Sequence, residues 1–208
     1  LELRKHLNFA PDGPLDDLIG NLENKGFLIL LQEIDDEKFS GINGFVNNRP
    51  YIMLNKKMSQ ERNRSTIVHE LAHLMFNWNE TNLSEKEIEN YATMISGAFL
   101  FPKVDTIREL GIRRKFISKD MILVAVEYGI SMMLLAKRAE LLNIVSSFSA
   151  KDFYVKASKL GWRKNEPSRI KEVEKPILFE QLVYRAINEN EISIQRGAEL
   201  LKMPYKKV

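Results

Sequence analysis

Strand-like patterns are confined to a short early part of this 208-residue chain. Residues 27–34 form a mostly apolar run of strand length, and residues 39–54 contain two more candidate strands, separated by Asn-Asn-Arg-Pro at 47–50. Asn43-Gly44 is an alternative hairpin turn, which leaves the register of these two strands open. Beyond residue 59 the apolar residues recur at helical spacing, with short breaks. The pattern predicts an α+β fold, in which a small N-terminal sheet is covered and then followed by helices.

The composition narrows the class of protein further. With 44% hydrophobic and 28% charged residues the chain resembles ordinary globular proteins, which excludes a disordered or fibrous protein. The charged first nine residues argue against a signal peptide, and no apolar run approaches the roughly 18 residues of a membrane span. The absence of cysteine excludes disulfides and thiolate metal sites. We therefore expect a cytoplasmic protein without membrane contact. Because the sequence begins with Leu, we also expect further residues to precede it.

The longest helical pattern runs from Ser59 to Trp78. Five apolar residues of this segment share one stripe at about 100° per residue, and we expect that stripe to face the core: Ile67, Leu71, Leu74, Met75 and Trp78. The opposite face is polar and carries His69 and His73, one turn apart. A shorter amphipathic helix of about three turns is expected between Pro14 and Gly26.

The segment His69-Glu70-Leu71-Ala72-His73 is an H-E-x-x-H motif on the longer helix. Residues i and i+4 of a helix overlie one another, so the two imidazoles can reach the same metal ion. Glu70 lies between them, close enough to take a proton from water at the metal. The alternative is a pair of surface histidines that flank a solvated glutamate. The strong periodicity of the helix favours a metal site, with Zn²⁺ as the ion and Glu70 as the catalytic base.

A catalytic zinc ion held by two histidines needs a third protein ligand and an open position. The chain has no cysteine, and its third histidine, His6, belongs to an N-terminal segment that we expect to be flexible. A carboxylate from the following helix, residues 84–100, is therefore favoured, and the candidates are Glu85, Glu87 and Glu89. We choose Glu89 because small residues on its side of the helix would allow a close approach to the histidine helix: Thr93, Ser96 and Gly97. The alternative role for Glu89 is that of a solvated first-turn acid that stabilises the helix N-terminus.

Several short sequences between residues 10 and 145 accompany the H-E-x-x-H motif. They are Asp12-Gly13-Pro14, Phe39-Ser40-Gly41, the run from Arg62 to His73, Glu89-Asn90-Tyr91-Ala92, Phe99-Leu100-Phe101-Pro102, Tyr128-Gly129-Ile130-Ser131 and Arg138-Ala139. Together they resemble the ImmA/IrrE family of bacterial metallopeptidases. The resemblance covers most of residues 10–145.

The resemblance implies a zinc peptidase in which a small sheet packs with a gluzincin-like pair of helices. Such a peptidase, of bacterial or phage origin, cuts a helix-turn-helix transcriptional repressor and so induces a mobile element or a stress response. Carried over to this sequence, His69, His73 and Glu89 would be the metal ligands and Glu70 the general base. A donor is also needed for the oxyanion of the tetrahedral intermediate. The possible suppliers are Arg64, Tyr91 and Tyr128, which the sequence does not rank.

Charge is distributed unevenly between the two halves of the chain. Residues 1–100 hold 10 Lys and Arg against 15 Asp and Glu, whereas residues 101–208 hold 21 against 13. The basic half, with its run Arg113-Arg114-Lys115, predicts contact with DNA or with an acidic partner. The alternative is a solvated helical surface that is rich in lysine.

Residues 120–144 have the outline of a helix-turn-helix, with two helices joined at Gly129-Ile130-Ser131. We therefore divide the chain into a zinc peptidase domain at 1–105, a helix-turn-helix-like subdomain at 106–150 and a C-terminal helical extension at 151–208. The competing interpretation is a DNA-binding or partner-binding regulator in which the H-E-x-x-H helix is vestigial.

Overall fold

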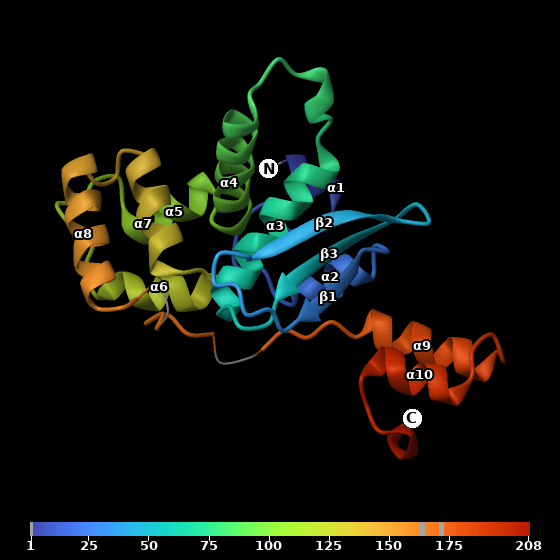
Figure 1. The fold of residues 1–208 in the computed structure, drawn as a ribbon. Coiled ribbons are helices and arrows are strands. Elements are labelled where there is room, and N and C mark those ends of the chain that lie inside the picture. The colour runs from blue at the N-terminus through green and yellow to red at the C-terminus, as the bar shows by residue number, and fades with distance from the viewer. Residues whose placement is uncertain (1, 163–164, 171–172) are drawn as a thin grey trace.

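A computed structural model of the chain describes residues 2–162, 165–170 and 173–208 (Figure 1). In this part of the chain the helices are α1 (Glu2–His6), α2 (Leu18–Glu23), α3 (Gln60–Met75), α4 (Glu85–Leu100), α5 (Lys103–Leu110), α6 (Asp120–Tyr128), α7 (Met132–Leu141), α8 (Ser147–Lys159), α9 (Leu178–Asn188) and α10 (Ile194–Leu201), with 3₁₀ turns η1 (Trp78–Glu80) and η2 (Tyr205–Lys207). The strands are β1 (Leu28–Gln32), β2 (Gly41–Val46) and β3 (Arg49–Asn55). The expected α+β class, with a mostly helical second half, is confirmed.

The sheet has the order β1-β3-β2, with β1 parallel and β2 antiparallel to the central strand β3. The hairpin between β2 and β3 turns on Asn47 and Asn48, both at positive φ (47° and 61°), a conformation that asparagine tolerates better than most residues. The turn is therefore shorter than the break expected at 47–50, because Arg49 and Pro50 already belong to β3. The alternative turn at Asn43-Gly44 is wrong, since both residues lie within β2.

The core forms where helices α2 and α3 cover one face of the sheet. Ile29, Ile52 and Leu54 are fully buried there, and they belong to one continuous cluster of buried residues that extends along the chain from Leu7 to Ala157. Figure 1 shows α5–α8 gathered to one side of the sheet, while α9 and α10 lie on the other. The expected boundary at residue 105 lies inside α5, and the division into three domains stays a prediction.

Two expectations about the N-terminal part are wrong. Residues 2–6 form the packed helix α1, which places Arg4 in the interior, where its Nε donates a hydrogen bond of 2.6 Å to the carbonyl oxygen of Phe99. The helix expected between Pro14 and Gly26 is α2, which has only six residues. It begins late because the Asp17 side chain accepts a hydrogen bond from the Gly20 amide and so caps the helix there.

The histidine helix also ends earlier than its apolar stripe indicates. Phe76 is extended (φ −108°, ψ 138°), so α3 stops at Met75 and Trp78 lies outside it, in η1. The Trp78 indole folds back and donates to the Ala72 carbonyl over 3.1 Å. Ile67 and Leu71 are fully buried as expected. Trp78 is only partly buried, so its assignment to the core stripe of the helix is wrong.

Helices α6 and α7 confirm the helix-turn-helix outline, but α7 is enclosed by its neighbours. Within α7 only Lys137 and Leu141, at its last position, are exposed. The buried guanidinium of Arg138 donates to the Phe101 carbonyl over 3.1 Å, and Gly97 of α4 leaves room for it, because a Cβ at Gly97 would lie 2.9 Å from Arg138 Cδ. A recognition helix needs a free face for the major groove. The packing of α7 against its neighbours leaves little free face for such a contact.

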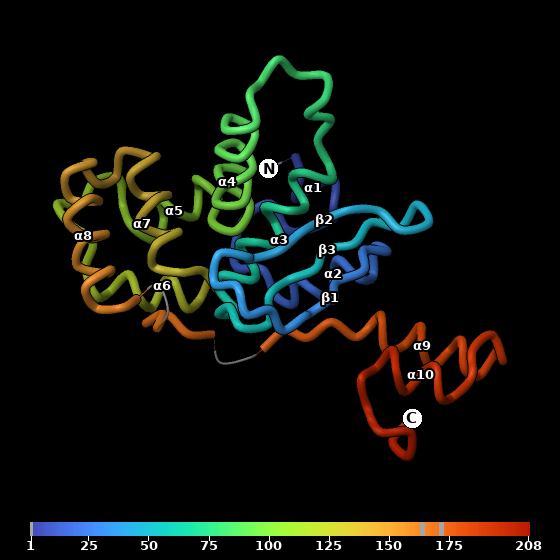
Figure 2. Tube along the Cα trace, in the orientation of Figure 1, coloured from blue at the N-terminus to red at the C-terminus, as the bar shows by residue number. Residues whose placement is uncertain are grey.

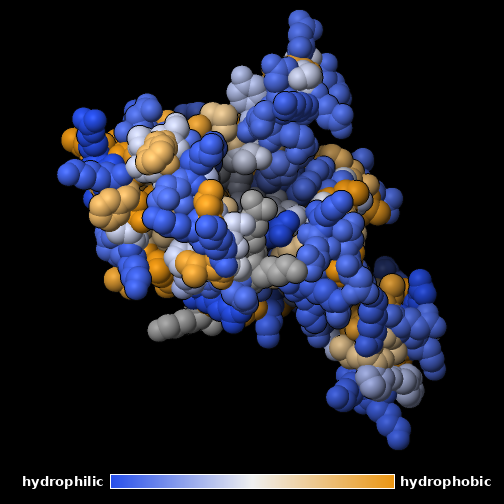
Figure 3. All heavy atoms as spheres, turned by 60° about the vertical axis from the view of Figure 1, so that its left-hand side comes forward, coloured by the Kyte–Doolittle hydropathy of each residue, from blue (hydrophilic) through white to orange (hydrophobic). Residues whose placement is uncertain are grey.

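The segment that leads into α9, from residue 173, passes the sheet, and α9 lies against β1 (Figure 2). In Figure 3, which turns the α6–α8 side forward, hydrophobic residues interrupt a mainly hydrophilic surface. The most exposed of the large hydrophobic side chains are Ile112 and Phe148 (82% each), Leu123 (75%), Phe45 (64%) and Phe116 (63%). Among the described residues, no helix has both the length and the apolar character that crossing a membrane requires.

Candidate metal centre

The N-terminal caps of α3 and α4 set where the two helices of the site begin. The Ser59 side chain accepts from the Arg62 amide at the start of α3. At the start of α4, the amide and the hydroxyl of Ser84 both donate to Glu87 Oε2, at 2.9 and 2.6 Å, and this hydrogen bonding holds the pKa of Glu87 below its ordinary value. Glu87 is therefore part of a capping box and is not free to act as a ligand.

Small polar side chains lie where α3 and α4 meet. The Ser96 hydroxyl donates to the Ser65 carbonyl over 2.8 Å, and Thr93 Oγ1 lies 3.4 Å from His69 Nδ1. These contacts agree with the close approach that Thr93 and Ser96 predict. Gly97 has a different role, because it faces Arg138 of α7. The short side chains bring the backbones together and place the second turn of α4 beside the histidines.

Three potential metal ligands converge between these helices. His73 Nε2 lies 3.2 Å from His69 Nε2, while the Glu89 oxygens lie 3.1 Å from His69 Nε2 and 3.2 Å from His73 Nε2. One ligand atom from each residue falls within a span of 4.8 Å. The histidine side chains are mostly buried, whereas Glu89 is 55% exposed. Two imidazole nitrogens and a carboxylate oxygen are a donor set that suits zinc, and the exposed side of Glu89 leaves the cluster open to solvent.

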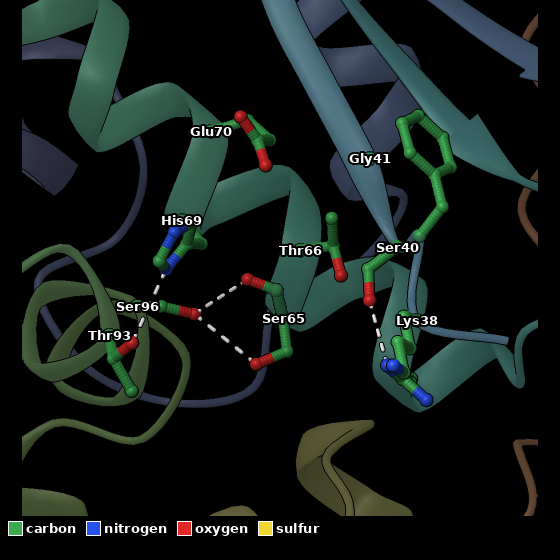
Figure 4. Close-up of a pocket in the computed structure, with 11 residues that line it drawn as sticks. Lys38, Ser40, Gly41, Ser65, Thr66, His69, Glu70, Thr93 and Ser96 are labelled. Carbon is green, nitrogen blue, oxygen red and sulfur yellow. Dashed lines mark hydrogen bonds between the residues drawn. The ribbon is translucent and has the colours of Figure 1, made fainter. Parts of the chain in front are cut away.

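Glu70 lies on the wall of a cavity of about 410 Å³ next to the cluster (Figure 4). Its Oε2 accepts a hydrogen bond of 2.6 Å from the side-chain amide of Asn43, in β2. Gly41, two residues earlier, makes this approach possible, because a Cβ there would lie 2.7 Å from Thr66 Cγ2 of α3. Sequence reasoning missed Asn43 because it left open whether Asn43-Gly44 is a turn or part of a strand. A strand that includes Asn43 places residues 41 and 43 on the same face of the sheet, and this pattern would have identified Asn43 as a neighbour of the histidine helix.

The three possible oxyanion donors lie away from this cavity. Arg64 is buried, pairs with Glu174 and donates to the Leu15 carbonyl over 2.7 Å. Tyr128 is also buried, its hydroxyl accepts from Arg108 over 2.8 Å, and burial raises its pKa to about 12. Tyr91 follows Glu89 by two residues, which turns it about 200° around α4. Of the described residues that line the cavity, none is Arg64, Tyr91 or Tyr128. The role of these three residues as oxyanion donors stays a prediction.

The remaining candidate ligands are also separate from the cluster. Glu85 is exposed at the start of α4, and His6 is exposed in α1. Within the described part of the chain, the histidine, aspartate and glutamate side chains that come together closely enough for a metal are His69, His73 and Glu89.

One protein-family model matches the part of the chain that holds this cluster. The sequence model of the M78 peptidases, described as the IrrE N-terminal-like domain, matches residues 25–140, more than half of the chain. This chain belongs to that family. The match extends from β1 to α7, so the M78 region of this chain contains the whole sheet, the H-E-x-x-H helix and Glu89. The resemblance seen in the sequence is confirmed. A search of curated proteins found no match to the chain.

Proposed function

We propose that this M78 family member is a zinc-dependent peptidase that cleaves a helix-turn-helix transcriptional repressor. The observation that carries the proposal is the convergence of His69, His73 and Glu89 next to a cavity that His69 and Glu70 line. The repressor as substrate, and the induction of a mobile element or stress response, come from the resemblance to the ImmA/IrrE family. Family membership supports the peptidase class itself.

In this proposal His69, His73 and Glu89 hold the metal, and Glu70 handles the proton. A zinc ion held by these ligands lowers the pKa of water toward about 7 and polarises a carbonyl group. Glu70 then accepts a proton from the attacking water and passes it to the leaving amine. The hydrogen bond from Asn43 occupies Oε2 and orients the carboxylate, which leaves Oε1 for this transfer. Asn43 is thus a positioning residue.

The strand β2 gives an extended peptide a place to bind. It is an edge strand, hydrogen-bonded to β3 on one side, so the backbone groups on its other side can pair with another chain. Because Asn43 of this strand touches Glu70, a peptide paired with β2 passes directly over the candidate catalytic carboxylate. This geometry favours a protein substrate that presents an extended segment.

We expect the purified protein to contain about one zinc ion per chain and to cleave the helix-turn-helix regulator encoded beside its gene, because three protein ligands suit a catalytic zinc site. Metal analysis of the purified protein measures the zinc content, and electrophoresis of the incubated regulator detects its cleavage. A chelator should stop cleavage, and added zinc should restore it. A preparation that is free of metal and still cleaves the regulator contradicts the proposed chemistry.

The basic half supplies a surface that fits an acidic protein partner better than DNA. Arg113, Lys115 and Ser147 are among the residues that line a cavity of about 610 Å³ between the segment before α6 and the start of α8. Their chain neighbours include the exposed side chains of Ile112, Phe116 and Phe148. Exposed apolar groups of this size gain little from phosphates but much from an apolar protein surface. We therefore propose that the repressor docks on this surface. The enclosed helix α7 contributes little to it.

Reversing the charge of Arg113 and Lys115 to Glu should slow association with the regulator about tenfold at low salt, because opposite charges steer encounter. The difference should shrink at physiological ionic strength, where the screening length is about 8 Å. Arg114 is left unchanged, since it donates to the Leu110 carbonyl over 2.6 Å and pairs with Asp120. Association rates and metal content are measured together.

The matched control changes Lys206 and Lys207 to Glu, which alters the net charge equally at an exposed site in η2. If both double variants slow association to the same extent, only overall charge matters and the docking surface is rejected.

A further inference from the structure

The cavity beside His69 and Glu70 has a basic end that the proposed proton transfer does not use. Lys38 and Ser40, from the segment before β2, form this end together with Arg62 from the first turns of α3. In Figure 4, Lys38 and Ser40 lie at the side of the cavity away from His69. Phe39 and four further hydroxyl groups also line the cavity, and the hydroxyl groups are those of Ser65, Thr66, Thr93 and Ser96.

The two cations at this end have unused charge. The Arg62 guanidinium donates one hydrogen bond, of 2.8 Å, from Nη2 to Ser40 Oγ. Neither Arg62 nor Lys38 has an ion pair with any residue in the ranges that the structure describes. Among the described residues that line the cavity, the acidic one is Glu70, and its Oε2 already accepts a hydrogen bond from Asn43. An open guanidinium beside an ammonium group is a suitable site for a carboxylate, which arginine binds through two parallel hydrogen bonds.

The distance between the basic end and Glu70 indicates which residue of a bound peptide could reach the basic end. Arg62 precedes His69 by seven residues on α3, which corresponds to about 10 Å along the helix axis. A peptide paired with the edge of β2 advances about 3.3 Å per residue. A side chain that enters the basic end from such a peptide therefore belongs to a residue within about three positions of the bond beside Glu70.

We propose that this cavity is a specificity pocket for an acidic side chain of the substrate. Arg62 contacts the carboxylate of an aspartate or glutamate near the scissile bond, and Lys38 adds positive charge behind it. The hydroxyl groups of the wall suit the polar end of such a side chain. This inference rests on the proposed peptidase function and adds to it the chemistry of one substrate residue.

The test uses the zinc-loaded 208-residue chain and synthetic ten-residue peptides with a fluorophore and a quencher. There are three series of peptides, in which one fixed position holds Glu, Gln or Lys and every other position is a mixture of amino acids. Within each series the fixed position is moved along the peptide. We expect kcat/KM for Glu to exceed that for Gln about tenfold or more at one position, because a hydrogen-bonded charge pair is lost with Gln. Arg62→Gln should remove this preference. The double variant Arg62→Glu with Lys38→Glu should transfer it to the Lys series.

A matched control is Arg49→Gln, which neutralises an exposed arginine at the hairpin, outside the pocket, and should keep the Glu preference. Binding of the same peptides to the Glu70→Gln protein, measured by fluorescence anisotropy, gives a second readout that needs no cleavage. Cleavage without a preference at any position overturns the pocket but not the peptidase. A Glu preference in binding that the Arg62→Gln variant loses supports the pocket, even if no peptide is cleaved. Binding with this preference but without cleavage would contradict the proposed peptidase function and leave the pocket standing. Binding without a preference overturns the pocket.

Discussion

Replacing Glu70 by Gln is expected to reduce cleavage of the regulator by about 10²- to 10⁴-fold, the range that a general base contributes. The amide cannot accept the proton of the attacking water, while its size and shape are almost unchanged. The contact with β2 should survive as well, because the carbonyl oxygen of Gln can accept the hydrogen bond that Asn43 donates to Glu70. The rate constant for cleavage, measured with saturating regulator, gives the effect directly.

Metal content and thermal unfolding separate this loss from damage to the site. Both should equal those of the unaltered protein, because Glu70 is outside the ligand cluster. Glu85→Gln is the matched control: it makes the same chemical change at an exposed carboxylate of α4 and should leave cleavage unchanged. Normal cleavage by the Glu70→Gln protein would show that another group accepts the proton.

The parts of the site that sequence alone predicts are those that depend on local spacing. The pairing of His69 with His73 follows from helix geometry, and their polar face follows from the apolar stripe on the other side of α3. Glu89 required one further step, from one helix to the next. We could infer Glu89 as the third ligand because the neighbouring residues Thr93 and Ser96 are small enough for the two helices to approach closely. The structure brings the Glu89 carboxylate to both histidines.

The parts that sequence alone missed depend on contacts between distant segments. Two Asn-containing turns were equally compatible with the local sequence of the hairpin, and only pairing with β3 places Asn43 in a strand that faces Glu70. Arg64 is adjacent to the motif, yet Glu174, 110 residues later, holds its guanidinium in the interior. The buried Arg4 likewise donates to backbone carbonyls that include that of the distant Phe99. Periodicity carries no information about such partners.

Removing either histidine should nearly abolish zinc binding. His69→Ala and His73→Ala each delete one of three protein ligands, and we expect the affinity for zinc to fall by more than about 100-fold, because loss of an outer partner of a ligand already costs 10- to 100-fold. Glu89→Ala should weaken binding less, since its exposed carboxylate is the ligand that water replaces most easily. Competition with a chromophoric chelator measures the affinities.

A second readout follows from the linkage between binding and folding. Zinc stabilises only the folded chain, so the rise in unfolding temperature on adding zinc should disappear in both histidine variants while their metal-free forms unfold as the unaltered protein does. His6→Ala is the control, because His6 is exposed in α1 and separate from the cluster. If the His69→Ala, His73→Ala double variant bound zinc with undiminished affinity, the metal would lie elsewhere, and Glu70 would no longer be adjacent to it.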